Sequence, residues 1–289
     1  MSQLKVSPIS TIEVDERTFY VKRDELIDPY LAGNKYRKLY TLLQTPPENY
    51  EKIISYGGSQ SNAMLAIAAM CKMKGWEFTY YTKPLSKVLK ESQEGNFFLA
   101  LSLGMKHIEI EHEYYKDFIA SMGLNLDVKT YIIDQGGADV HAKDGLEVLA
   151  EEIRASGVNV RSLATPSGTG TTAFYLALAL PEYTVYTVAC VGDASYLKMQ
   201  ISALGEIPDN LIILDVQKKY HFAKPYADFL KIYKKLLDAG IEFDLLYAPS
   251  MWISLLEHTD EEVLYIHSGG ITGNESMLKR YKSKNFSLV

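Results

Sequence analysis

The stretch of sequence that says most about the fold and the chemistry is Leu31-Ala32-Gly33-Asn34-Lys35-Tyr36-Arg37-Lys38-Leu39, with Lys35 at its centre. Gly33 and Asn34 predict a turn and a helix N-cap, and residues 36–43 predict a helix. Lys35 would then hold an ammonium at the positive end of a helix dipole. This position disfavours the charged form and lowers the pKa of the amine.

Two explanations of Lys35 are open from this stretch alone. Most lysines are exposed, so the bland explanation is a surface cluster with Arg37 and Lys38. The sharper explanation is that a partly neutral lysine attacks an aldehyde and forms a Schiff base, the usual attachment of pyridoxal phosphate to a protein. The rest of the chain decides between them.

Outward from this stretch, short β-rich segments alternate with helical patterns along almost the whole chain. Strands are predicted near residues 53–56, 76–82, 106–110, 129–133, 160–164, 184–191, 211–215 and 263–267. Helices are predicted between them, among others over residues 62–74, 88–103 and 139–155. This alternation predicts an α/β fold with βαβ units and mostly parallel sheets.

Composition limits the class of protein. The 289 residues, 47% of them hydrophobic, suffice for one large domain or two modest ones. A net charge of −6 gives no sign of a nucleic-acid surface. Cys71 and Cys190 lie in apolar contexts that favour reduced core thiols. Neither a signal peptide nor a membrane-spanning run is visible, so a cytoplasmic protein without a membrane partner is expected.

The first of two glycine turns is Ser55-Tyr56-Gly57-Gly58-Ser59-Gln60-Ser61-Asn62, between a predicted strand and a predicted helix. Glycines let the backbone approach a ligand closely. Gln60, Ser61 and Asn62 then lie at a helix N-terminus, where free N–H groups attract an anion such as a substrate carboxylate. An ordinary strand-to-helix turn with a Ser or Asn cap explains the segment equally well.

The second glycine turn is Ala164-Thr165-Pro166-Ser167-Gly168-Thr169-Gly170-Thr171-Thr172, before an apolar helix. Glycines and hydroxyl residues at a helix start are typical of a phosphate cup made of N–H and hydroxyl donors. The segment lacks the Gly-Lys-Ser/Thr of a Walker loop, and Ala173 breaks the dinucleotide fingerprint. We therefore expect phosphate contacts from Ser167, Gly168, Thr169, Gly170 and Thr171.

Other catalytic classes lack their residues. The six histidines have no ligand spacing to a cysteine or to a second histidine, so no metal site is expected. No Gly-x-Ser-x-Gly segment is present to supply a hydrolase nucleophile. A nucleotide-binding oxidoreductase stays a distant alternative, since it explains neither Lys35 nor the Gln60-Ser61-Asn62 turn.

Taken together, the motifs resemble the pyridoxal-phosphate family of 1-aminocyclopropane-1-carboxylate (ACC) deaminase and D-cysteine desulfhydrase. The matching segments follow the family's order over nearly the whole chain, more loosely in its C-terminal half. They are Lys22-Arg23-Asp24, Gly33-Asn34-Lys35-Tyr36-Arg37-Lys38-Leu39, Gln60-Ser61-Asn62, Gly136-Gly137 with Gly145, residues 167–172, Asp244-Leu245-Leu246-Tyr247 and His267-Ser268-Gly269-Gly270.

The resemblance implies a tryptophan-synthase-β-like fold (fold type II), with two α/β domains and pyridoxal 5'-phosphate between them. The smaller domain would span residues 39–145, and the larger would combine residues 1–38 with residues 146–289. A homodimer that acts on a small amino-acid substrate is expected.

The resemblance also implies which residues hold the cofactor. Lys35 would form the internal aldimine and move the Cα proton of the substrate. Lys38 and the 167–172 loop would hold the phosphate, and Asn62 would bond the pyridine hydroxyl. Ser268 is the family-matched partner of the pyridine nitrogen.

Fewer residues are implied on the substrate side. Ser61 would contact the substrate carboxylate and relay a proton, with Gln60 and Asn62 beside it. Tyr247 would face the substrate.

Three positions depart from the family's pattern. Ala248 stands where the family usually carries Glu or Thr near the pyridine nitrogen, and Phe222 stands at a tyrosine position. Ala63 stands where His or Gln is common. The first two changes remove polar groups, which argues against opening the ACC ring. Simple α,β-elimination needs only a base, an electron sink and a leaving group.

The leading hypothesis is therefore pyridoxal-phosphate-dependent elimination and deamination of a small amino acid, with D-cysteine as the best single substrate. ACC deaminase is the alternative within the family. A pyridoxal-phosphate-binding protein with little or no turnover is the alternative from another class.

Overall fold

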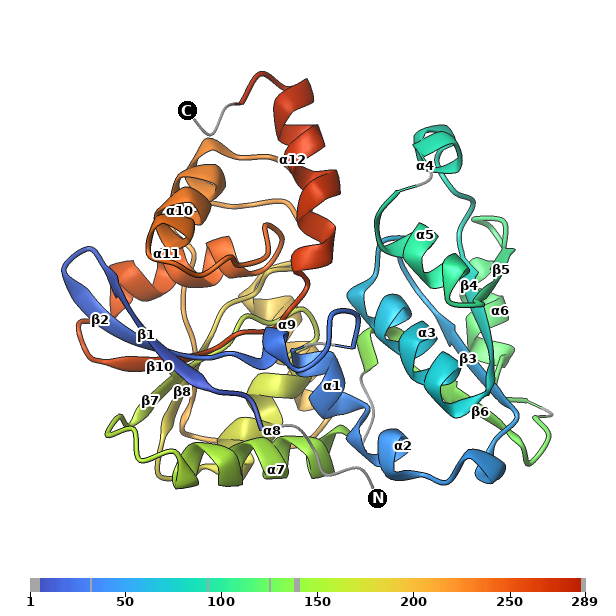
Figure 1. Ribbon diagram of the computed structural model, residues 1–289, viewed down its shortest axis with the longest axis horizontal. Coiled ribbons are helices and arrows are strands. Elements are labelled where there is room, and N and C mark those ends of the chain that lie inside the picture. The colour runs from blue at the N-terminus through green and yellow to red at the C-terminus, as the bar shows by residue number, and fades with distance from the viewer. Residues whose placement is uncertain (1–5, 32, 93, 125, 138–140, 287–289) are drawn as a thin grey trace.

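The computed structural model describes residues 6–286 except 32, 93, 125 and 138–140. Figure 1 shows two sheets side by side, each covered by its own helices, with α1 (Asn34–Lys38) between them. The predicted α/β architecture with two mostly parallel sheets is confirmed. No helix in the described ranges is both long enough and apolar enough to cross a membrane.

The larger sheet has six strands in the order β1-β2-β10-β7-β8-β9. All neighbours are parallel except the β1–β2 pair. Its strands are β1 (Ile9–Val14), β2 (Arg17–Lys22), β7 (Ser162–Ala164), β8 (Thr184–Thr187), β9 (Leu211–Ile213) and β10 (Val263–Ile266). β10 and β7 are fully buried, as expected for central strands that helices cover on both faces.

The β1–β2 hairpin was not among the predicted strands. Its turn residues, Asp15 and Glu16, both have positive φ, at 52° and 61°. Two-residue turns of this kind usually contain glycine or asparagine, because other residues are strained there. The Asp-Glu pair therefore gives no turn signal, although Ile12, Val14 and Phe19 alternate with exposed or half-buried residues.

The smaller sheet has four parallel strands in the order β5-β4-β3-β6. They are β3 (Lys52–Tyr56), β4 (Glu77–Thr82), β5 (Lys106–Glu109) and β6 (Thr130–Ile133), all close to their predicted ranges. Helix α3 (Asn62–Lys74) buries nine successive residues against this sheet and its neighbours. These four strands lie inside the predicted 39–145 domain, whose boundaries remain a prediction.

The remaining helices differ from the sequence prediction in two places. A single helix over residues 88–103 was wrong, because α4 (Lys87–Ser92) ends before α5 (Gly95–Ser102). Gly95 has φ +78°, a left-handed conformation that interrupts a helix. Helix α7 (Ala142–Ala155) is confirmed, but its predicted start at Asp139 lies outside the described residues.

The other helices cover the sheets and carry loops to the interface between them. They are α2 (Tyr40–Gln44), α6 (Tyr115–Ser121), α8 (Thr171–Ala179), α9 (Ala194–Ser202), α10 (Ala227–Asp238), α11 (Ala248–His258) and α12 (Asn274–Ser283), with the short 3-10 turns η1 (Asp24–Leu26), η2 (Pro47–Asn49), η3 (Gln135–Gly137) and η4 (Ile271–Gly273). Loops at the carboxyl ends of β3, β6, β7 and β10 meet around α1. Ligands of open α/β sheets bind at such strand ends.

Candidate active site

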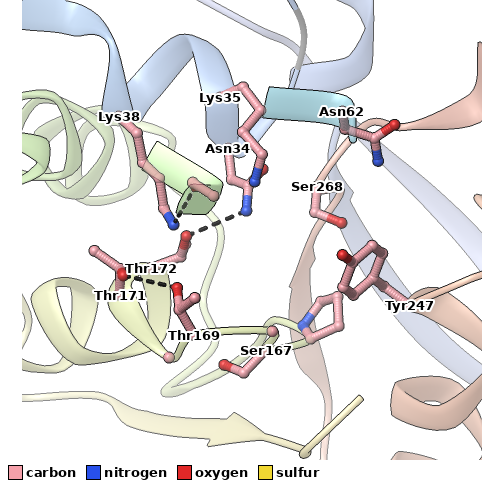
Figure 2. A pocket seen from close by; sticks show the side chains of 14 residues that line it. Asn34, Lys35, Lys38, Asn62, Ser167, Thr169, Thr171, Thr172, Tyr247 and Ser268 are labelled. Carbon is pink, nitrogen blue, oxygen red and sulfur yellow. Dashed lines mark hydrogen bonds between the residues drawn. The ribbon is translucent and has the colours of Figure 1, made fainter. Parts of the chain in front are cut away.

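One pocket gathers residues from all of these loops. It is lined by Asn34, Lys35, Lys38, Asn62, Gly136, Pro166, Ser167, Gly168, Thr169, Gly170, Thr171, Thr172, Tyr247 and Ser268. Figure 2 shows Asn34 and Lys38 reaching toward the 169–172 side chains, with Tyr247 and Ser268 on the opposite wall. Every residue predicted for the site is present except Gln60 and Ser61.

The start of the Lys35 helix differs from the prediction. The N-cap is Gly33, not Asn34, and α1 is only five residues long before α2 follows at Tyr40. The Asn34 amide instead donates to Thr172 Oγ1 at 3.3 Å, across to the glycine loop. Asn34 therefore links the Lys35 segment to the second glycine turn. The sequence predicted only a helix cap at this position and gave no sign of this contact.

The pKa of Lys35 is lowered from its ordinary value to about 8. The predicted direction is confirmed, but the cause was wrong. Burial removes water from the ammonium and is the main effect, while the negative charge of Asp244 opposes it. A one-turn helix such as α1 carries too little dipole to be the main cause.

This pKa predicts a pH profile for attachment of pyridoxal phosphate to the cofactor-free protein. With a pKa of about 8, about 10% of Lys35 is the reactive free amine at pH 7, against about 0.03% of an ordinary lysine. Deprotonation increases as pH rises, so the rate of attachment should increase with a midpoint near pH 8 and level off above it. Borohydride trapping followed by peptide mass spectrometry measures this rate for each lysine.

Lys87, whose side chain is 89% exposed, is the internal control for that measurement. Its labelling gives the pH profile of an amine that is in contact with water. A Lys35 profile that follows that of Lys87 would contradict the assignment of burial as the cause.

Lys38 lies one helical turn after Lys35 and faces the same pocket. Among the residues that the structure describes, its ammonium hydrogen-bonds to the Gly136 carbonyl alone, at 3.4 Å. Burial and the nearby charge of Lys35 lower the pKa of Lys38 well below its ordinary value. Among the described residues, no carboxylate pairs with either amine. Two amines in one pocket, neither in an ion pair with a described carboxylate, favour an anionic ligand, because a charge removed from water is costly unless it is paired.

The glycine loop supplies donors for such an anion. Helix α8 begins at Thr171, so its first backbone N–H groups are free to point into the pocket. The hydroxyls of Thr169 and Thr171 are 2.9 Å apart at the same place. By contrast, Ser167 is held by the neighbouring segment: its hydroxyl is bonded to Thr187 at 2.7 Å, and its N–H donates to the Val188 carbonyl at 3.1 Å. The residues present thus fit a phosphate group.

Gly170 is required by the fold of this loop and not only by the ligand. Its φ is +78°, and a Cβ there would lie 2.3 Å from Ile201 in α9. A side chain at this position would therefore collide with the core below the loop. Gly168 differs, since a Cβ there would only touch the Tyr247 ring, at 3.4 Å.

A buried ion network holds α1 in place. Arg37 donates to both carboxylate oxygens of Asp24, at 2.8 and 2.9 Å, and to both of Glu152, at 2.6 and 2.8 Å. Lys22 pairs with Glu152 at 2.6 Å. Because Arg37 lies between Lys35 and Lys38 in one short helix, anchoring its guanidinium fixes the direction of both amines.

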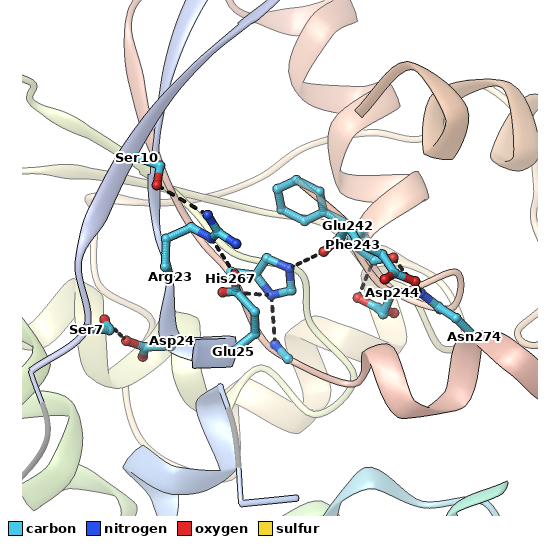
Figure 3. A network of polar contacts seen from close by, with 12 residues as sticks. Ser7, Ser10, Arg23, Asp24, Glu25, Glu242, Phe243, Asp244, His267 and Asn274 are labelled. Atoms are coloured by element: carbon cyan, nitrogen blue, oxygen red, sulfur yellow. Dashed lines mark hydrogen bonds and ion pairs between the residues drawn. The ribbon is translucent and has the colours of Figure 1, made fainter. Parts of the chain in front are cut away.

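His267 directly precedes Ser268 in the chain, and Figure 3 shows polar contacts at both of its ring nitrogens. The Nε2 atom lies 2.9 Å from the Glu242 carbonyl, which can only accept, so Nε2 carries a hydrogen. The Nδ1 atom accepts from Gly269 N at 3.1 Å. Phe243 stacks on the ring with 4.5 Å between centroids, and Glu25 Oε2 lies 3.6 Å from Nδ1.

Tyr247 is positioned by Asp244. The Asp244 carboxylate accepts from the backbone N–H groups of Leu246, Tyr247 and Ala248, at 2.9, 2.6 and 3.3 Å. Burial raises the pKa of Asp244. The carboxylate therefore caps α11 and does not line the pocket. Phe222 packs on the Tyr247 ring with 5.2 Å between centroids.

Gln60 and Ser61 are the predicted residues that do not line the pocket. Ser61 is the N-cap of α3, and its hydroxyl accepts from Ala63 N at 3.2 Å and Met64 N at 3.3 Å. The Gln60 side chain lies beside Gly95. The structural alternative for this turn, a Ser cap, is thus present, and the proposed carboxylate contact remains a prediction.

Three lining residues were not predicted as site residues: Asn34, Gly136 and Pro166. Pro166 directly precedes the predicted 167–172 loop and would have been found by extending that loop by one residue. Gly136 carried a signal as part of a family-matched Gly-Gly pair. Asn34 was predicted only as a helix cap in a family-matched segment, and its bonding partner is 138 positions away in the sequence. Within the described ranges, no group of His, Cys, Asp and Glu could hold a metal ion.

Comparison with known proteins agrees with the resemblance seen in the sequence, although no family model matches the chain. A putative ACC deaminase of Thermotoga maritima is 27% identical over 93% of this chain and 95% of its own length. A similar protein of Pyrococcus furiosus, also named a putative ACC deaminase, is 25% identical over 88% of this chain and 85% of its own length. The resemblance to the ACC deaminase family is confirmed.

The fold is confirmed by a solved structure described as an ACC deaminase homologue. It superposes with a TM-score of 0.75 over 96% of this chain and 95% of its own, at 21% identity. The protein therefore has the tryptophan-synthase-β-like fold, fold type II, with two α/β sheets.

Proposed function

We propose, from the likeness to the ACC deaminase family, that this protein uses pyridoxal 5'-phosphate to eliminate a leaving group from a small amino acid and deaminate the product. The observation that carries the proposal is the pair of amines, half-buried Lys35 and buried Lys38, that line one pocket with the 167–172 loop. A phosphate on this loop would supply the missing counter-charge, and an aldehyde would meet the free amine of Lys35.

When bound, the cofactor withdraws the electrons released by loss of the substrate Cα proton. Lys35 would hold the cofactor covalently through its amine and, once displaced by the substrate amine, accept that proton. A pKa of about 8 suits this work, because general bases act best when their pKa lies near the working pH.

The other residues would bind and orient. Lys38, the first N–H groups of α8 and the Thr169 and Thr171 hydroxyls would hold the phosphate. Asn62 would donate to the ring oxygen, and the Ser268 hydroxyl would face the ring nitrogen. Tyr247 would shape the substrate side of the pocket.

We propose D-cysteine as the substrate, because the electron sink is weak. Ala248 offers no carboxylate, and the Asp244 carboxylate is occupied by three backbone donors. A hydroxyl such as that of Ser268 can donate to the ring nitrogen but cannot hold a positive charge there. A substrate that expels sulfide carries the electrons away with the leaving group. D-Cysteine and water would give pyruvate, hydrogen sulfide and ammonia.

Two alternatives rest on specific observations. ACC deaminase is favoured by the names of the relatives. A cofactor-binding protein with little turnover is favoured by the apolar Ala248 and Phe222 beside an otherwise complete cofactor pocket.

A keto-acid assay over D-cysteine, L-cysteine, β-chloro-D-alanine and ACC tests the proposal. We expect D-cysteine and β-chloro-D-alanine to be turned over at least about tenfold faster than ACC, because the ACC ring carbon is a poor leaving group. Faster release from ACC would favour the first alternative, and a yellow protein inactive on all four would favour the second. Ala248→Glu should not raise D-cysteine turnover by orders of magnitude, since elimination does not need the stronger sink.

A further inference from the structure

The polarity of the Asn62 side chain decides what it can do in the pocket. An amide presents a donor at one end and an acceptor at the other, and the two ends have nearly the same shape. Only the NH₂ end could bind an anionic ring oxygen. Whether Asn62 can serve the cofactor therefore depends on which end its neighbours hold.

Asn96, on α5, holds the oxygen end. Asn96 is 1% exposed, and its Nδ2 atom donates to the Gln60 carbonyl at 3.2 Å and to Asn62 Oδ1 at 2.7 Å. Its Oδ1 accepts from the Thr272 hydroxyl at 2.8 Å. Three of the four hydrogen bonds that this amide can make are present, including both that its nitrogen can donate.

The Gln60 carbonyl determines which end of the Asn96 amide is the nitrogen, and so which end of the Asn62 amide faces Asn96. A backbone carbonyl has no hydrogen to give, so the Asn96 atom that faces it must be the nitrogen. That nitrogen has a second hydrogen, which faces Asn62 and requires an acceptor there. Asn62 must therefore turn its oxygen to Asn96 and its NH₂ group away.

The freed NH₂ group of Asn62 has room beside the pocket. A Cβ on Gly270 would lie 2.5 Å from Asn62 Nδ2, so a side chain there would displace the amide from its present position. Among the described residues, Nδ2 donates to no protein atom, and Asn62 lines the pocket. An unused donor at the pocket wall is available to a ligand.

We propose that Asn96 is a positioning residue that sets the polarity of Asn62, so that Asn62 presents a donor to the ring oxygen of the cofactor. The inference rests on the proposed function. Because Thr272 belongs to η4 beyond the larger sheet while Asn96 and Asn62 cover the smaller one, the bond from Thr272 also links the two halves of the pocket.

Asn96→Asp tests the proposal by reversing the polarity. A carboxylate cannot donate, so Asn62 should turn its NH₂ group toward residue 96 and its oxygen toward the pocket. The dissociation constant for pyridoxal 5'-phosphate should rise about tenfold or more, because a bond to a charged oxygen is lost. The pH midpoint of the absorbance change of bound cofactor should move up by about one unit, since a donor that favoured the anion is gone.

Asn96→Ala is the second variant, because a buried carboxylate is costly to the fold. It removes the constraint without reversing it, so both effects should be smaller than in Asn96→Asp but in the same direction. Asn210→Asp is the matched control. Asn210 also uses Nδ2 on backbone carbonyls, those of Ala177, Leu180 and Tyr183, but away from the pocket.

A merely structural role for Asn96 gives a different result. All three variants would then lower the melting temperature and leave the pH midpoint at the wild-type value, which would overturn the inference. The proposed function is tested separately by the wild type. If wild-type protein does not bind pyridoxal 5'-phosphate, the proposed function fails. If it binds and Asn96→Ala keeps the wild-type midpoint, only the role of Asn96 fails.

Discussion

Lys35→Ala should abolish covalent attachment of pyridoxal phosphate and lower turnover by about a thousandfold or more. The amine is the group proposed to hold the cofactor and to move the substrate proton, and loss of a general base alone typically costs 10²–10⁴ in rate. Borohydride reduction of the loaded protein, followed by peptide mapping, measures the attachment. Keto-acid release measures the turnover.

Lys38 is the competing candidate for covalent attachment, because it is a second amine in the same pocket and is buried. A reduced adduct on Lys38 in the wild type would overturn the assignment of Lys35. Lys35→Arg should fail as Lys35→Ala does, since a guanidinium stays protonated and cannot form an imine. Lys87→Ala, at an exposed position, should leave both readouts unchanged.

Gly33→Ala should destroy the pocket by displacing the Ser268 turn. Gly33 has φ +59°, and a Cβ there would lie 2.1 Å from both the C and the O atoms of Ser268. Neither is a side-chain atom that could rotate away, so the backbone of one segment must move. Backbone strain and overpacking together should lower the free energy of unfolding by about 2–4 kcal/mol. Cofactor binding should fall with it, because Lys35 follows two residues later.

Gly157→Ala is the matched control for that change. Gly157 has a similar φ of +73°, but a Cβ there would meet nothing within 4 Å. In this variant the free energy of unfolding should fall by about 1 kcal/mol, from backbone strain alone, and cofactor binding should be unchanged. Chemical denaturation and cofactor titration of both variants give the comparison. Equal losses in the two variants would show that the contact with Ser268 does not matter.

Local patterns carried most of the fold prediction. The strand-to-helix alternation and the two glycine turns depend on residues that are neighbours in the chain, and the predicted parallel strands of both sheets formed. The β1–β2 hairpin was not predicted, because Asp15 and Glu16 adopt positive φ in its turn and no glycine marks that turn in the sequence. Its stability comes from pairing with β10, more than 240 residues later, which no local window contains.

The sequence by itself determined which residue types face a ligand. They are the lysine Lys35, two positions after Gly33, the hydroxyl residues and glycines of the loop before α8, and the amide of Asn62 after the first glycine turn. The tertiary structure decided how they act. Burial, not a helix dipole, sets the pKa of Lys35. The bond from Thr272 to Asn96 spans 176 positions, and that from Lys38 to Gly136 spans 98. Hydrogen-bond direction and desolvation depend on atoms brought together only by folding, so neither can be read along the chain.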